Sequence, residues 1–123
     1  MGYYFVHFYD RDPSVYAHLS NGNNPLSYSA LNKDQPIAVP TLGTKGARDP
    51  YIIAAPDKSK YWILATDLKI STTNWDAATR TGSRSIFVWE STDLVNWGKE
   101  RLVQVRLFQA LPALAPQPNF QPR

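Results

Sequence analysis

Short runs of apolar, aromatic and β-branched residues alternate along this chain with polar or proline-containing turns. Such runs indicate strands, and no stretch shows the 3.6-residue apolar period of an amphipathic helix. Predicted strands comprise residues 3–9, 14–19, 26–31, 51–55, 60–66, 85–90 and 101–105. The pattern therefore predicts an all-β fold.

The pattern of strands and turns repeats itself. Residues 15–21 are similar to residues 86–92, and each of these segments follows an aromatic strand and precedes a polar turn. The repeated unit is an antiparallel meander of up to four strands, which is typical of β-propeller blades. A sandwich is the alternative, although sandwiches rarely repeat their sequence. Since the first copy lacks its innermost strand, the repeat predicts about two blades, the first of them incomplete.

Composition limits the classes of function. The chain of 123 residues has no Cys, which excludes disulfides and thiolate metal sites. Its net charge of +3 comes from scattered basic residues, which is a weak argument for nucleic-acid binding. His7 and His18 lie in predicted strands without further ligands at metal-binding spacing, so we expect them to pack. No apolar run is long enough to span a membrane, and the first residues lack the features of a signal peptide. We expect no metal, cofactor, nucleic acid or membrane partner, and localisation and oligomeric state stay open.

The most distinctive local pattern surrounds Asp49. Gly43 and Gly46 permit a tight backbone path, and Pro50 disfavours helical backbone at the residue before it. We therefore predict that Asp49 is extended and opens the strand at residues 51–55, where a loop meets the sheet. Binding and catalytic groups often occupy such positions. The alternative is that Asp49 only caps the turn before Pro50.

Four stretches, taken together, resemble glycoside hydrolase family 43, the family of arabinanases, α-L-arabinofuranosidases and β-xylosidases. These stretches are residues 46–53, 64–68, 75–84 and 88–97. The last one also occurs in related propeller hydrolases, so the full set in this order is the more specific signal. The resemblance covers about residues 3–105 and implies a five-bladed β-propeller that acts on arabinose- or xylose-containing plant polysaccharides or oligosaccharides. This chain would hold the N-terminal part of that propeller.

The resemblance also implies an inverting mechanism with three acidic residues, of which one can be matched here. The general base of the family stands in an Asp-Pro pair that corresponds to Asp49-Pro50. The carboxylate that tunes the acid and the glutamic general acid belong to later blades. Glu90 falls in the turn motif at the end of a blade and is expected to be structural. The chain alone is therefore expected to be inactive.

Propeller topology predicts that the polar loop at residues 67–84 emerges beside Asp49, because the strand before it returns to the end where Asp49 lies. By the same reasoning, residues 10–12 lie at that mouth. Trp75 could stack on a sugar ring, and charged residues of the loop could bind hydroxyl groups. It is equally open that Trp75 anchors the loop and that the charges are solvated. The candidate substrate-binding residues are Trp75, Asp76, Arg80 and Arg84.

The last stretch, residues 106–123, departs from the family pattern. It has four prolines, no acidic residue and no strand alternation. We therefore predict an N-terminal propeller part at residues 1–105 and an irregular, disordered tail at residues 106–123. A non-catalytic carbohydrate-binding or interaction fragment is the alternative function. A nucleic-acid binder is less favoured, since the aromatic residues follow strand periodicity and the basic residues do not cluster.

Overall fold

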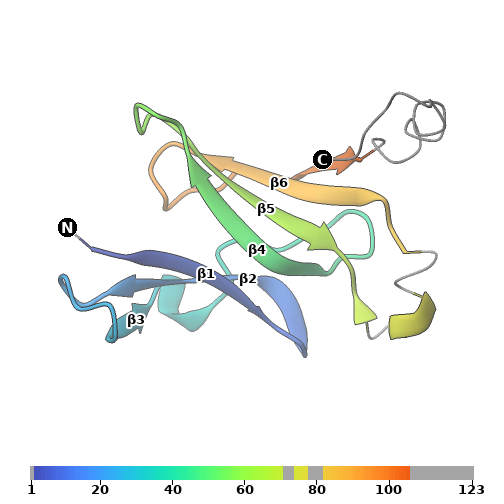
Figure 1. Cartoon of the computed structure of the whole chain (residues 1–123), viewed down its shortest axis with the longest axis horizontal. Helices are drawn as coiled ribbons and strands as arrows, with labels where there is room; N and C mark the ends of the chain where they lie inside the picture. The colour runs from blue at the N-terminus through green and yellow to red at the C-terminus, as the bar shows by residue number, and fades with distance from the viewer. Residues whose placement is uncertain (1, 71–73, 78–81, 106–123) are drawn as a thin grey trace, which may run out of the picture.

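The computed structural model of the chain describes residues 2–70, 74–77 and 82–105. Within these ranges the chain forms two antiparallel sheets whose strand order follows the sequence (Figure 1). The smaller sheet consists of β1 (Tyr4–Tyr9), β2 (Asp12–Ser20) and β3 (Tyr28–Ala30), and the larger sheet consists of β4 (Ala47–Ala54), β5 (Tyr61–Asp67), β6 (Ser85–Ser91) and β7 (Arg101–Gln104). Helical backbone among the described residues is limited to the 3-10 turn η1 (Asn32–Asp34), residue 70 and residues 75–77. The prediction of an all-β fold is confirmed.

The two sheets repeat one meander, as the sequence predicted. Strands β1, β2 and β3 follow one another in the same antiparallel order as β5, β6 and β7, and β4 is the additional strand of the second copy. The sheets lie one above the other, and β4 of the larger sheet packs against β1 and β2 of the smaller one (Figure 1). This arrangement is consistent with two adjacent blades of a β-propeller, the first without an innermost strand.

The core lies between the sheets and is built from alternate residues of the strands. Val15, Ile63, Phe87 and Trp89 are its largest fully buried side chains. In β5 and β6 every second residue is buried, which is the period of two that sends side chains to opposite faces of a sheet. The indole of Trp89 stacks on the ring of Phe87 with 5.4 Å between the ring centroids. Packing of these side chains between the sheets therefore fixes the position of one sheet relative to the other.

One backbone prediction was wrong. Asp49 is not extended, since its φ is +50°. Arg48 pairs with Thr66 and Tyr51 pairs with Leu64, so Asp49 and Pro50 together face the single residue Ala65. This is a β-bulge, in which a left-handed first residue is common. Pro50 has no N–H to donate to the ladder, and a bulge is one of the few places in a sheet where such a residue is tolerated. Strand β4 consequently begins at Ala47, before the bulge, rather than at residue 51.

The two histidines are neighbours in space, which their sequence spacing did not indicate. Register places Phe5 opposite His18 and His7 opposite Tyr16. The Nε2 atom of His7 lies 3.2 Å from Nδ1 of His18, within a cluster of aromatic rings on one face of the smaller sheet. Among the described residues, no group of three or more His, Asp or Glu side chains could hold a metal ion. The pair is therefore part of an aromatic cluster.

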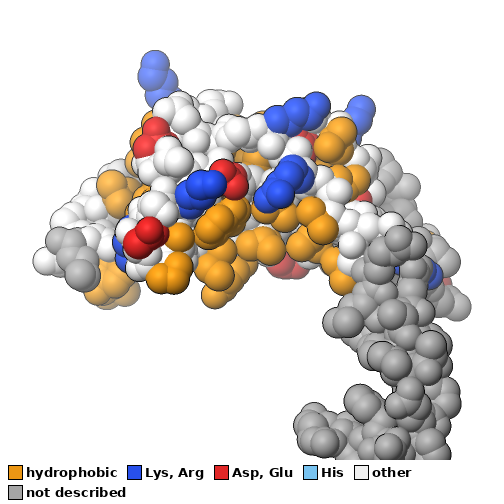
Figure 2. Space-filling view, turned by 90° about the horizontal axis from the view of Figure 1, so that it is seen from above, with side chains coloured by type: hydrophobic (Ala, Val, Ile, Leu, Met, Phe, Trp, Pro, Cys, Tyr) orange, Lys and Arg blue, Asp and Glu red, His pale blue; other side chains and the backbone are white. Residues whose placement is uncertain are grey.

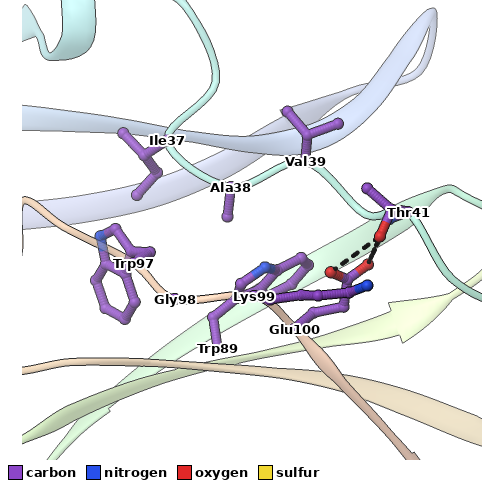
Figure 3. Close-up of a pocket in the computed structure, with 9 residues that line it drawn as sticks. All are labelled: Ile37, Ala38, Val39, Thr41, Trp89, Trp97, Gly98, Lys99 and Glu100. Carbon is purple, nitrogen blue, oxygen red and sulfur yellow. Dashed lines mark hydrogen bonds between the residues drawn. The ribbon is translucent and has the colours of Figure 1, made fainter.

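A buried carboxylate ties the loop before β4 to the start of β7. Glu100 accepts hydrogen bonds from the backbone N–H of Thr41 and, at 3.0 Å, from that of Leu42. Thr41 and Glu100 line a hollow of about 320 Å³ beneath the loop at residues 37–41, with Trp89 and Trp97 on its opposite wall (Figure 3). Burial by itself raises the pKa of Glu100, but hydrogen bonds from the N–H groups of Thr41, Glu100 itself and Leu42 and from the Thr41 hydroxyl together outweigh it and lower that pKa below the ordinary value of 4.5.

Replacing Glu100 by Gln should lower the free energy of unfolding by about 1–3 kcal/mol, because the N–H groups of Thr41 and Leu42 lose a charged acceptor. Because the carboxyl has a lowered pKa in the folded state, its contribution is present above pH 4.5 and is lost as pH falls below that value. Urea unfolding at pH 7 and pH 3.5 measures both effects. Thr92→Ala, at an exposed position, is the control. An equal effect of Glu100→Gln at both pH values would contradict the pH dependence.

Apolar side chains are exposed on the outward face of the larger sheet. Tyr51 is 65% exposed, and Ile53 and Val103 are also exposed. Part of the apolar surface is visible in Figure 2 as a band of hydrophobic side chains beside a row of Lys and Arg. None of the helical segments among the described residues has the length and apolar character that crossing a membrane requires.

We expect this exposed face to make the isolated chain self-associate, since exposed apolar patches beside an unpaired strand edge favour association. Light scattering across a concentration series should show a rising mean mass. The double variant Tyr51→Thr with Ile53→Thr keeps β-branched residues in β4 and should reduce the mass toward that of a monomer. A chain that stays monomeric at high concentration would contradict this expectation.

Candidate functional site

Three segments far apart in the sequence meet at one end of the molecule. They are the β1–β2 turn, the start of β4 and the segment that follows β5, all at the right-hand end of Figure 1. Together they form an open hollow of about 440 Å³, lined by Asp10, Arg11, Arg48, Ile70 and Trp75. We call it the mouth hollow. It lies where a sheet ends and loops begin, the usual position of binding groups on a rigid scaffold.

Arg48 lies at the centre of the mouth hollow, and the residue is only 8% exposed. Its Nη2 atom lies 2.8 Å from Oδ1 of Asp10. The guanidinium carbon lies 4.6 Å from the ring centroid of Phe8 and 5.2 Å from that of Trp75, within cation–π range. The sequence reasoning singled out the residues around Arg48 but not Arg48 itself, because its burial arises from partners in two distant segments.

Asp49 follows Arg48 and projects from the bulge. It is exposed, and among the described residues it has no hydrogen bond or ion pair. It does not line the mouth hollow, whereas its neighbour Arg48 does. The candidate base is therefore a solvent-accessible carboxylate beside the hollow, held on a strand that is paired on both sides of the bulge.

Of the three candidate substrate-binding residues that the structure describes, Trp75 lines the hollow, and Asp76 and Arg84 do not. Trp75 is 58% exposed and lines it, lying against Arg48. Asp76 is exposed on the same short helical segment, and Arg84 is exposed just before β6, with its carbonyl oxygen accepting a hydrogen bond of 2.7 Å from the N–H of Val105. Arg80 lies outside the described residues. Trp75 thus has both a contact that anchors it and an accessible ring face.

The loop that leads into β4 is held by a second buried carboxylate. Asp67, at the end of β5, accepts hydrogen bonds of 2.8 Å from both the N–H and the hydroxyl of Thr44. Gly43 has a φ of +56°, and a Cβ atom there would lie 2.6 Å from the Asp67 carboxylate oxygens. Only glycine fits this approach without a shift. Asp67 therefore positions the backbone before Arg48 and Asp49, and its Oδ1 atom accepts both hydrogen bonds.

Glu90 lies at the other end of the larger sheet. It pairs with Trp62, near the start of β5, whereas Arg48 pairs with Thr66 near the end of that strand. Its carboxylate accepts a 3.1 Å hydrogen bond from the Trp62 indole and lies 3.3 Å from Nζ of Lys60. The indole hydrogen bond, followed by Lys60, lowers the pKa of Glu90. A general acid at neutral pH needs a raised pKa. Its position at the other end of the sheet and its lowered pKa both indicate that Glu90 is a structural residue.

Comparison with known proteins places these features in a family. A family model described as a probable glycosyl hydrolase domain, related to glycoside hydrolase family 43, matches residues 1–123. An alpha-L-arabinofuranosidase of Bifidobacterium longum subsp. longum is 35% identical over 75 residues, which cover 61% of this chain and 7% of that relative. The chain thus corresponds to a small part of the curated relative. No solved structure matches.

Proposed function

Because this chain belongs to the probable glycosyl hydrolase domains related to glycoside hydrolase family 43, we propose that it supplies the N-terminal part of an inverting hydrolase of arabinan- or xylan-type polysaccharides. In this proposal Asp49 is the general base and Trp75 contacts a sugar of the substrate. The alpha-L-arabinofuranosidase relative supports arabinofuranosides as one substrate class, and β-xylosides follow from the motif resemblance.

The observation that carries the proposal is the placement of Asp49. A general base must be ionised and must reach the water that it deprotonates. The Asp49 carboxylate is exposed, and it stands on a paired strand next to a hollow with an accessible indole ring. It lies in a bulge, and bulges often redirect a side chain beside an active site.

In an inverting reaction the base takes a proton from water as the water oxygen attacks the anomeric carbon. The glycosidic bond breaks on the opposite face, and a general acid protonates the leaving oxygen. The two carboxyl groups then stand about 6.5–9.5 Å apart. Asp67 is buried and already bonded to Thr44, and Glu90 lies at the far end of the sheet. We propose that neither serves as that acid and that the acid belongs to a segment outside this chain.

The test compares the 123-residue chain with an extended protein, in which the continuation of the arabinofuranosidase relative follows residue 105. The substrates are 4-nitrophenyl α-L-arabinofuranoside and 4-nitrophenyl β-D-xyloside. We expect turnover by the extended protein, with the inverted anomer as the first product seen by NMR, and none by the chain alone. Turnover by the chain alone, or a retained anomer, would overturn the proposal.

The second candidate is a non-catalytic carbohydrate-binding fragment, and the exposed ring of Trp75 favours it, since aromatic faces are common sugar platforms in such a role. This candidate predicts that the extended protein is inactive while the chain binds xylo- or arabino-oligosaccharides. Trp75→Ala would then weaken binding, and Asp49→Asn would leave it unchanged.

A further inference from the structure

The ion pair in the mouth hollow is unequally buried. The side chain of Arg48 is 10% exposed, whereas the side chain of Asp10 is 84% exposed. A buried cation requires a partner, because an unpaired charge removed from water is costly. A carboxylate on an exposed turn is, by contrast, well hydrated and gives up little when it leaves the pair. The partner of Arg48 can therefore be exchanged for another carboxylate at small cost.

The hollow also carries an excess of positive charge. Among the residues that the structure describes, Arg48 and Arg11 both line it, and Asp10 is the one acidic residue of the lining. Asp12, on the same turn, accepts hydrogen bonds from Ser14, at 3.1 Å, and from the hydroxyl of Tyr16. Asp12 is thus engaged on the sheet and does not line the hollow. If a ligand displaced Asp10, it would meet the guanidinium group of Arg48, while that of Arg11 lies 5.0 Å from the ring centroid of Tyr9 on the same rim.

We propose that the mouth hollow binds an acidic saccharide, namely a uronic acid whose carboxylate replaces Asp10 on Arg48 while its ring lies against Trp75. Guanidinium groups bind carboxylates through parallel, charge-assisted N–H donors, which are stronger than hydrogen bonds to the uncharged hydroxyl groups of a neutral sugar. The volume of about 440 Å³ lies within the usual range of small-molecule sites. This inference deepens the proposed function, since it names a substrate feature recognised beside Asp49.

Binding can be measured on the 123-residue chain without any hydrolysis, so the outcome does not depend on Asp49. The probes are xylotriose that carries one glucuronic acid, unsubstituted xylotriose, and acetate. By calorimetry or NMR titration we expect the acidic trisaccharide to bind about tenfold or more tightly than the neutral one. Its affinity should fall with added salt. Acetate should bind far more weakly, because it has no ring to lie on Trp75.

Substitutions distinguish ligand binding from a purely structural ion pair. Asp10→Asn removes the competing carboxylate and should strengthen binding of the acidic trisaccharide. If the ion pair only held the mouth hollow in shape, the same substitution would weaken binding. Arg48→Lys keeps a buried cation but loses the planar fork, so binding should weaken about tenfold. Lys58→Gln, which removes a cation in the β4–β5 turn at the other end of the sheet, is the control and should have no effect.

Equal affinity for the acidic and neutral trisaccharides would overturn the inference, as would weaker binding by Asp10→Asn with an unchanged melting temperature. Acetate binding as tightly as the acidic trisaccharide would indicate an anion site without saccharide recognition. If the extended protein hydrolyses glycosides in an Asp49-dependent way but shows no preference for the acidic trisaccharide, this inference fails and the proposed function stands. The reverse result would reject Asp49 as the base and leave the uronic acid site in place.

Discussion

Asp49→Asn is expected to lower kcat of the extended protein by about 10²–10⁴-fold, with a small change in KM. The base acts on water in the transition state and makes no contact that the bound sugar requires. An amide in its place cannot take the proton of the attacking water. Hydrolysis of 4-nitrophenyl α-L-arabinofuranoside under saturating and limiting substrate gives both constants.

The backbone around Asp49 makes this substitution a clean test. Asp49 has a φ of +50°, a conformation that Asn tolerates better than most residues, so Asn should preserve the bulge. Asp49→Gly also suits this conformation and leaves space in which added formate could replace the missing carboxylate. Partial recovery of activity with formate would identify Asp49 as the base rather than as a structural residue.

The matched control is Asp57→Asn. Asp57 is an exposed carboxylate in the β4–β5 turn, where it accepts hydrogen bonds from the N–H and hydroxyl of Ser59 at the opposite end of β4. Its replacement should leave kcat unchanged. A loss of less than tenfold for Asp49→Asn, or an equal loss for Asp57→Asn, would reject Asp49 as the general base.

Strand positions could be predicted because their determinants are local. Residues such as Ile63 and Ala65, or Phe87 and Trp89, alternate with outward-facing neighbours, and Pro- or Gly-containing segments mark the turns. The repeat added the order of strands within each sheet. The strand and turn signals lie within a few residues of one another and the repeat is a comparison within the sequence, so no tertiary information was needed to read them.

The details of the site depend on contacts between distant segments. The backbone of Asp49 is set by the register of β4 on β5, which places two residues opposite Ala65. Pro50 alone predicted an extended Asp49, and the bulge overrode that preference. Arg48 is buried because Phe8, Asp10 and Trp75 surround it, and the contact between His7 and His18 follows from the register of β1 on β2. A single sequence does not specify such contacts.

The mouth hollow requires that the two sheets keep their relative position. Asp10 and Arg11 come from the smaller sheet, whereas Arg48 and Trp75 come from the larger sheet and the segment that follows it. The ion pair between Arg48 and Asp10 therefore crosses from one sheet to the other. Substitutions that loosen the core between the sheets should therefore change the relative positions of the residues that line the hollow, even when the substituted residue lies far from it.

Trp89→Ala is accordingly expected to have the largest effect on stability, a loss of about 3–5 kcal/mol in the free energy of unfolding. Trp89 is 2% exposed, stacks on Phe87, and borders the hollow beneath the loop at residues 37–41 (Figure 3). Truncation removes its buried apolar area and enlarges that hollow. Since small domains are stabilised by about 5–15 kcal/mol, this loss is a large share of the total and should shift the urea midpoint clearly downward.

Trp62→Ala is the control on the neighbouring strand. Trp62 faces outward, is half-buried, and donates its indole N–H to Glu90, so its loss should cost about 1 kcal/mol. Urea unfolding followed by far-UV circular dichroism measures both variants, and Trp89→Phe should recover most of the loss because it retains a ring against Phe87. If Trp89→Ala cost no more than Trp62→Ala, the region between the sheets would not be the core that holds the mouth hollow together.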